Sequence, residues 1–269
     1  MISMPWRLRL ISNDYVKKSY FIILLIAALV LMSLFTWFFV ILERRVNELE
    51  VQVYDLKSTL RKVEDIINNR TPLGKEKLAD LIVVDSRIRN ISISIYSGNF
   101  SRDIVLYTKW VHAVINYTDD GFYPLIFGNV TFIRDFWQKS TETLNLRRGD
   151  CEDLAILLAA LIKASYTNAS VYVVAMEISG NALGHAALLV VYENHAYIAD
   201  PTVDRIFSLG NELSEIKSSV LKWFSEMGGI SVRLSFIVGK LWDGKSVYKS
   251  FNSNLEFIEW LDELLKTHV

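Results

Sequence analysis

The chemistry open to this chain of 269 residues is narrowed by its single cysteine, Cys151. One cysteine excludes both an intramolecular disulfide and a zinc cluster with several cysteine ligands. It can still serve as a nucleophile if it is deprotonated and has a base beside it. That base must come from one of four histidines, which are His112, His185, His195 and His268.

Cys151 lies where a buried helix is predicted to begin. Asp150 resembles an N-cap, with Asp153 three residues on, and the stretch Leu154 to Ile162 is apolar on every side. The start of a helix carries a partial positive charge, which favours the thiolate. Two arginines before the cysteine support that charge state and two acidic residues after it oppose it. An inert buried cysteine is the alternative interpretation.

A predicted hairpin selects the base. With a turn at Glu193-Asn194, Tyr192 lies opposite His195 on the neighbouring strand. Residues directly opposite one another share a face of the sheet, and so do residues two apart. His185 and Asp200 therefore lie on one face as diagonal neighbours, and His195 points to the other. A turn shifted by one residue would break this assignment.

These segments resemble the cysteine, histidine and aspartate blocks of the transglutaminase-like superfamily. The similarity covers roughly Asp85 to Thr202 and has the order and spacing of the family. The quoted blocks are Arg148-Gly149-Asp150-Cys151-Glu152-Asp153-Leu154-Ala155, Gly184-His185-Ala186 and Ile198-Ala199-Asp200-Pro201-Thr202, with Phe136-Trp137-Gln138 and Glu142-Thr143-Leu144 before them.

The resemblance implies a papain-like α+β core in which a buried, cysteine-bearing helix packs on an antiparallel sheet. It implies Cys151 as nucleophile, His185 as base and Asp200 as the acid that orients the base. The implied activity is attack on an amide of a protein or peptide substrate through a thioester, as a peptidase, amidase or acyl transferase. Trp137 and Gln138 are candidates to join the backbone N–H of Cys151 in an oxyanion hole. The family also has non-catalytic members, so a surface binding or scaffold protein is the alternative.

Other classes of function have less support. The balance of 29 basic and 30 acidic residues gives no global reason to bind nucleic acid. Cys151, His185 and Asp200 could together ligate a metal ion, but no HxxxH motif or second cysteine supports that. The sequence therefore predicts no metal and no cofactor.

An apolar run predicts a membrane anchor. Residues Tyr20 to Leu42 carry no charged side chain, and at about 1.5 Å per residue they can cross a ~30 Å hydrocarbon core. Basic residues exceed acidic ones before the run, which favours a cytoplasmic N-terminus and an external C-terminal domain in the cell membrane. Six sequons after the run agree with that side and predict a glycoprotein; they are Asn69, Asn90, Asn99, Asn116, Asn129 and Asn168.

The next segment has the heptad spacing of a coiled coil. Apolar residues recur at alternating intervals of four and three, and they are Leu42, Val46, Leu49, Val53, Leu56, Leu60, Val63 and Ile67. β-branched residues at the first core position with Leu at the second favour a parallel homodimer. One helix laying this stripe on its own domain is the alternative. The predicted division is 1–19 cytoplasmic, 20–42 transmembrane, 43–68 stalk and 75–269 domain.

Within residues 75–269, helical spacing gives way to strand alternation, which predicts an α+β domain. Ile91 to Ile95 alternates like a strand, although it could start a helical hairpin, and Asp119 to Pro124 is expected to be a loop. Helices are expected at Asp103–Asn116, Thr141–Leu146 and Leu255–Lys266, and strands at Val171–Ile178, His185–Tyr192, Ala196–Ile198 and Val232–Val238.

Overall fold

The structure is a computed structural model that describes residues 6–120, 122–126, 129–132, 135–178, 184–193, 195–210, 212–227 and 232–267. The turn residue Asn194 and the stretch Ser179-Gly180 therefore lie outside the described residues. The chain divides into two compact units, Met1–Arg61 and Lys62–Val269, and each is described here by itself.

The first unit consists of one helix, α1 (Trp6–Arg70), whose last turns belong to the second unit. From Tyr20 to Leu60 its large apolar side chains are exposed, and the hydroxyls of Ser33 and Thr36 bond to backbone carbonyls of the same helix. Within the described residues, one stretch, Lys17–Asp65, is long and apolar enough to cross a membrane by length and composition. A signal sequence near an N-terminus satisfies the same criterion.

The second unit is α+β, as predicted. Its helices are η1 (Pro72–Leu81), α2 (Ser86–Ile95), α3 (Phe100–Val114), α4 (Ser140–Leu146), α5 (Cys151–Ser165), α6 (Leu213–Met227) and α7 (Asn254–Thr267). The long strands are β5 (Ser170–Ile178), β6 (Gly184–Tyr192), β7 (His195–Asp200), β8 (Arg205–Leu209), β9 (Val232–Lys240) and β10 (Ser246–Ser250). Short strands β1 (Asn116–Tyr117), β2 (Phe122–Ile126), β3 (Asn129–Phe132) and β4 (Arg148–Gly149) form two small ladders.

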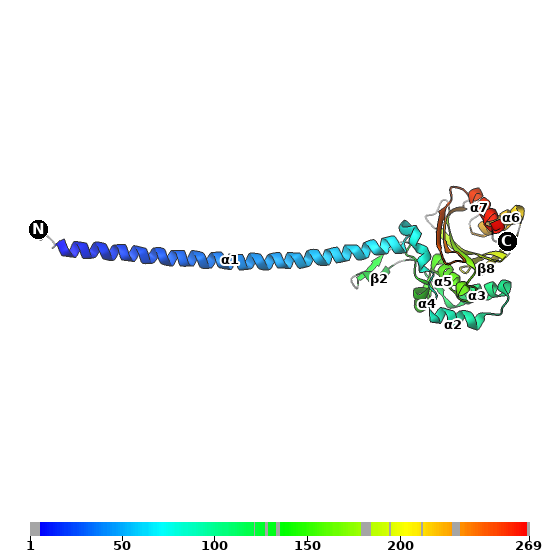
Figure 1. The fold of residues 1–269 in the computed structure, drawn as a ribbon, viewed down its shortest axis with the longest axis horizontal. Coiled ribbons are helices and arrows are strands. Elements are labelled where there is room, and N and C mark those ends of the chain that lie inside the picture. Colours follow the sequence, from blue (N-terminus) through cyan, green and yellow to red (C-terminus); the bar gives the residue numbers. More distant parts are fainter. Residues whose placement is uncertain are drawn as a thin grey trace. The chain divides into compact units, whose positions relative to one another are not determined.

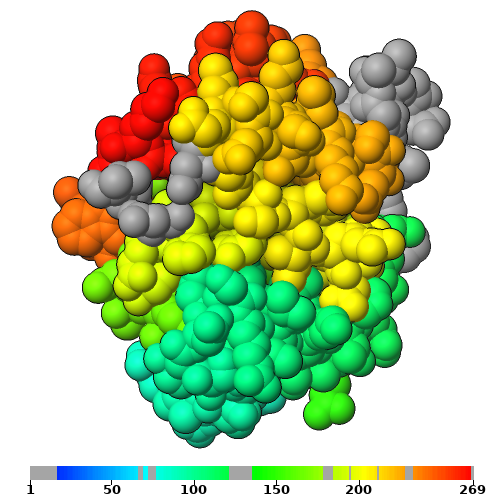
Figure 2. Space-filling model, turned by 90° about the vertical axis from the view of Figure 1, so that its right-hand side faces the viewer, coloured from blue at the N-terminus to red at the C-terminus, as the bar shows by residue number. Residues whose placement is uncertain are grey.

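The long strands form one antiparallel sheet in the order β10-β9-β5-β6-β7-β8. Each face of this sheet is covered by its own layer of helices. Helices α2 to α5 lie on one side, and α6 and α7 lie on the other (Figure 1). The same layers are visible on the surface in Figure 2, where α2 and α3 lie at the bottom and α6 and α7 toward the top.

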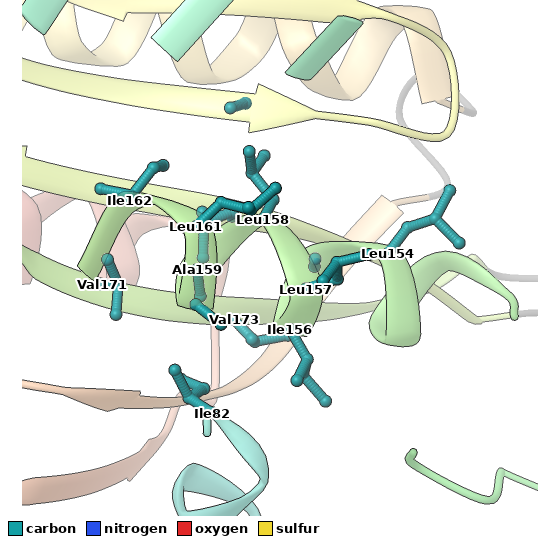
Figure 3. Close-up of a cluster of buried hydrophobic side chains, with 14 of the residues drawn as sticks. Ile82, Leu154, Ile156, Leu157, Leu158, Ala159, Leu161, Ile162, Val171 and Val173 are labelled. Atoms are coloured by element: carbon teal, nitrogen blue, oxygen red, sulfur yellow. The ribbon is translucent and has the colours of Figure 1, made fainter. Parts of the chain in front are cut away.

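Helix α5 is the centre of the larger core. From Leu154 to Ile162 each residue is buried, because the helix is apolar on every side. Figure 3 shows its side chains pointing in several directions, toward Val171 and Val173 of β5 on one side and other elements elsewhere. This burial fixes the axis of the helix, and so it fixes where its first residue, Cys151, lies.

Two expectations for local structure were wrong. The stretch Ile91 to Ile95 belongs to helix α2 and is not a strand. The alternative interpretation, a helical hairpin, is the one that the structure has, in α2 and α3. Residues 122–124, expected in a loop, belong to strand β2, which pairs with β3. Gly121 in that expected loop lies outside the described residues.

Candidate active site

His185 and Asp200 meet as the predicted hairpin requires. Tyr192 lies opposite His195, which confirms the predicted register of β6 and β7. Nε2 of His185 donates to Oδ2 of Asp200 over 2.7 Å. A carboxylate only accepts hydrogen bonds, so the proton lies on Nε2 and the basic atom of the neutral ring is Nδ1.

Asp200 is held from three sides. It is fully buried, and besides His185 it accepts the backbone N–H of Thr202 over 3.1 Å and the indole N–H of Trp223 over 3.4 Å. Trp223 comes from α6 and is itself fully buried. These donors fix the carboxylate, and the carboxylate in turn orients the ring of His185.

Cys151 lies beside the residue that follows this histidine. It is the first residue of α5 and is 7% exposed. The backbone N–H of Ala186 on β6 donates to the cysteine. Helix α5 packs on β6, so its N-terminus reaches the end of the strand that carries His185. The structure thus brings together the neighbourhoods of all three predicted residues.

The thiol of Cys151 has a different acceptor, however. It donates to Oε2 of Glu152 over 3.2 Å, and among the hydrogen bonds of the described residues it has none to His185. Burial raises the pKa of the Cys151 thiol well above its usual value, and the charges of Glu152 and Asp150 raise it further. At rest the cysteine is therefore a neutral thiol, because burial and the acidic neighbours together outweigh the effect of the helix N-terminus.

A cluster of buried carboxyls surrounds the start of α5; we call Asp120, Asp150, Glu152 and Asp153 the acidic cluster. Burial is the main cause that raises the pKa of Asp150, Glu152 and Asp153, and the mutual repulsion of the carboxylates adds to it. Oδ1 of Asp150 and Oδ2 of Asp153 are buried and have no hydrogen-bond partner. The raised pKa values mean that these buried carboxyls lose their charge more readily than exposed ones.

The acidic cluster is also where a cation would fit by distance. Asp120, Asp150 and Asp153 each place one ligand atom within 4.8 Å of the others, and so do Asp150, Cys151 and Glu152. Oxygen ligands of this kind suit hard divalent cations. His185 and Asp200 bond to each other and are in neither group.

The two candidate oxyanion residues lie next to the acidic cluster, in the segment before α4. Both are 3% exposed. The backbone N–H of Gln138 donates to Asp153 over 2.7 Å, and that of Trp137 donates to the carbonyl of Arg70 over 2.8 Å. Their backbone donors are thus already used, and the Trp137 ring stacks on Phe236. Oε1 of Gln138 is buried without a partner.

The other histidines lie elsewhere. His195 is exposed, and its ring stacks on Tyr197, on the opposite face of β7 from Asp200, as predicted. Nδ1 of His112 lies 3.0 Å from the carbonyl oxygen of Pro201, so this residue holds the turn that follows Asp200. His268 lies outside the described residues.

Comparison with models of protein families shows to which family the chain belongs. A family model described as "Transglutaminase-like domain" matches residues 86–223, just over half of the sequence. The chain belongs to this transglutaminase-like family. The match begins at the start of α2 and ends at Trp223, so it includes Cys151, His185 and Asp200. The α+β arrangement of a cysteine-bearing helix on an antiparallel sheet is the fold that the sequence predicted.

Solved structures show distant similarity. Legionella pneumophila LapG has 16% identity and a TM-score of 0.38, and the match covers 74% of this chain and 98% of LapG. A chain described as a candidate cysteine protease from Cytophaga hutchinsonii has 12% identity and a TM-score of 0.34, and covers 68% of this chain and 57% of its own length. No curated protein matches the chain.

Two parts of the site were missed by the sequence analysis. Trp223 was missed because α6 was not predicted, although Ile216, Val220, Trp223 and Phe224 have helical spacing and are all buried. The contact between Glu152 and the thiol was missed because adjacent helical residues are not expected to face each other. Helical spacing was thus a usable signal for the first, and the sequence offered none for the second.

Proposed function

We propose that this transglutaminase-like chain is a thiol enzyme that cleaves or transfers amide-linked acyl groups. Cys151 is the nucleophile, His185 the base and Asp200 the group that orients the base. One observation carries the proposal: buried Asp200 holds His185 by a 2.7 Å hydrogen bond, and the next residue along the strand donates to Cys151. An imidazole oriented by a buried carboxylate, one residue away from the backbone group that contacts the single cysteine, favours catalysis over binding alone.

The reaction follows from these positions. His185 takes the thiol proton on Nδ1, and the sulfur attacks the amide carbonyl carbon. The carbon–nitrogen bond breaks, the amine leaves with the proton from His185, and a thioester remains on Cys151. Water or a second amine then attacks the thioester, and the thiol is restored. The N–H groups of the first turn of α5 precede its first helical bond, from Leu154 to Asp150, and are suited to bind the oxyanion.

The resting geometry requires one change before this reaction. The thiol must turn from Glu152 toward His185, and the charge of the acidic cluster must be neutralised. Substrate binding that excludes water, or protonation of the cluster, would favour that turn. The enzyme proposed here therefore has an inactive resting thiol.

The test is activity-based labelling of the full chain with peptide, isopeptide and glycan-amide probes. Wild-type chain should take up a probe at one site, and Cys151→Ala should take up none. Because the chain has a single cysteine, a label on any other residue is easily recognised. If no probe labels Cys151 while the folded domain retains an affinity for peptides or glycans, the alternative of a surface binding or scaffold protein is supported.

We also propose that α1 anchors the enzyme in the cell membrane, with residues 1–19 cytoplasmic and the domain outside. The lipid bilayer would then be its partner along Tyr20 to Leu42. Of the sequon residues, Asn90, Asn99, Asn116 and Asn168 are exposed in the structure, as glycosylation requires, and Asn69 is half-buried. Protease added to intact cells should digest the region after Leu42. Protection of that region until the cells are lysed would reverse the orientation.

A further inference from the structure

Arg70, the last residue of α1, is bound tightly by the domain. Its guanidinium forms a two-pronged pair with Glu142 of α4 at 2.9 and 2.8 Å, and the Arg70 side chain is 15% exposed. It also donates to the carbonyl oxygen of Trp137 over 3.3 Å and lies 5.6 Å above the ring of Phe136. All these residues belong to the unit Lys62–Val269.

The segment Phe136–Gln138 joins Arg70 to the acidic cluster. Its three successive backbone N–H groups donate to different partners: Phe136 to Asp120, Trp137 to the Arg70 carbonyl and Gln138 to Asp153. Two of these acceptors are carboxylates of the cluster beside Cys151, and the third is the end of α1. The segment therefore holds the start of α5 on one side and Arg70 on the other.

We propose that Arg70 is a positioning residue for Cys151. It fixes Phe136–Gln138, that segment fixes Asp153, and Asp153 lies in the same first turn of α5 as the thiol. The effect of Arg70 on turnover rests on the proposed function. Its effect on the reactivity of the Cys151 thiol does not. Arg70 at the C-terminal end of α1 then influences the reactivity of the cysteine from within the unit Lys62–Val269.

The segment has other supports, so it should survive loss of the arginine. Trp137 stacks on Phe236 with ring centroids 5.9 Å apart, and the hydroxyl of Ser140 accepts the backbone N–H of Val83 over 3.0 Å. Arg70→Ala should therefore loosen the segment without unfolding the domain. Arg70→Lys keeps the positive charge but cannot form the paired hydrogen bonds of a guanidinium with Glu142. It should therefore hold the segment in place only in part.

The test measures the alkylation rate of Cys151 by iodoacetamide between pH 6 and 10, on the full chain in detergent. Cys151 in the Arg70→Ala variant should be alkylated about tenfold faster than in wild type at pH 8. Cys151 is only 7% exposed, so loosening of the segment by even a fraction of an ångström should increase access to its thiol. Arg70→Lys should lie between the two. The matched control is Arg205→Ala, which removes a looser and more exposed ion pair with Glu226.

Thermal unfolding of each variant is measured alongside. If Arg70→Ala stays folded and alkylates within twofold of wild type at every pH, the inference is wrong. If Arg70→Ala unfolds at the assay temperature, Arg70→Lys decides by the same criterion. Failure of the proposed function gives a different result: the alkylation rate still responds to Arg70, but no probe forms a thioester on Cys151.

Discussion

The thiol of Cys151 is bonded to a carboxylate, while the imidazole of His185 is bonded to Asp200. Glu152 therefore controls the charge state of the nucleophile. Burial is the main cause that raises the pKa of Cys151, and the charge of Glu152 in its ionised form and its hydrogen bond with the thiol raise that pKa further. A residue next to the nucleophile thus lowers the reactivity of that nucleophile.

Glu152→Gln should increase the reactivity of the Cys151 thiol. The substitution removes the negative charge that Glu152 carries above its raised pKa of about 8 and keeps the shape, so the pKa of Cys151 should fall and alkylation above pH 8 should speed up several-fold. The rate of iodoacetamide labelling across pH measures it. Glu259→Gln, an exposed residue of α7, is the control. An unchanged pH profile in Glu152→Gln would show that the carboxylate does not set the thiol pKa.

At this scale the sequence predicts much of the site. Strand alternation and one turn were enough to pair His185 with Asp200 and to place His195 on the other face. The support of Asp200 by Trp223 could not be predicted from that hairpin, because it comes from helix α6, which follows later in the chain. Helical spacing could have predicted α6 itself, but its contact with Asp200 depends on how the helix packs on the sheet.

The first turn of α5 brings three acidic side chains into a buried environment. Asp150 occupies the N-cap position but makes no side-chain cap bond, and burial raises the pKa of Glu152 to about 8. A carboxyl whose pKa is raised on folding binds protons more tightly in the folded state. Its stabilising effect is complete below the unfolded pKa, near 4, and is lost as the pH rises through the folded pKa.

The domain should therefore unfold at a lower temperature at pH 8 than at pH 5. Asp153→Asn should flatten this dependence, because the amide stays neutral and its oxygen can still accept the N–H of Gln138. We expect the difference in Tm between the two pH values to shrink by roughly 5 °C, because the pKa of Asp153 is raised well above its usual value and the substitution removes that titration. Thermal unfolding followed by circular dichroism measures it.

The same scans with a chelator and with a divalent cation separate protons from metal. A cation that raises Tm at pH 8 in wild type, but not in Asp153→Asn, would show that the acidic cluster binds metal. A wild-type Tm that rises between pH 5 and pH 8 without added metal would contradict the assignment of raised carboxyl pKa values.

Among the elements, α2 shows why local alternation misleads. Isoleucine and serine alternate from Ile91 to Ile95, which is typical of a strand, but Ile88, Ile91 and Ile95 also have helical spacing. All three pack against the core, whereas Ile93 is 61% exposed. Ser92 is buried, and its hydroxyl donates to the carbonyl of Leu161 over 2.7 Å. A polar residue thus occupies a core-facing position of the helix. For this reason the hydrophobic pattern does not distinguish the helical period from the strand period here.

At the scale of the whole molecule, the heptad stripe on α1 is uncovered between Leu42 and Leu60. Val46, Leu49, Val53, Leu56 and Leu60 are all exposed in the single chain. Their heptad spacing predicts that a second copy covers them in a parallel dimer, and this prediction and the division of the chain remain to be tested.

Val53→Asp combined with Leu56→Asp should convert a dimer to a monomer, because four charges would enter the seam of the two chains. The matched control is Val51→Asp with Tyr54→Asp, a pair with the same spacing that lies off the stripe and is exposed. Sedimentation in detergent measures the oligomeric state. A wild-type chain that is already monomeric would rule out the dimer.

The central claim is that Cys151 and His185 act as a nucleophile and its base, and the rate of Cys151 alkylation at neutral pH tests it most directly. His185→Ala should slow alkylation about tenfold or more, because the thiol loses its proton acceptor, while His195→Ala should stay within about twofold of wild type. Both variants should remain folded. A slow His195→Ala beside an unchanged His185→Ala, or two variants that match wild type, would contradict the account.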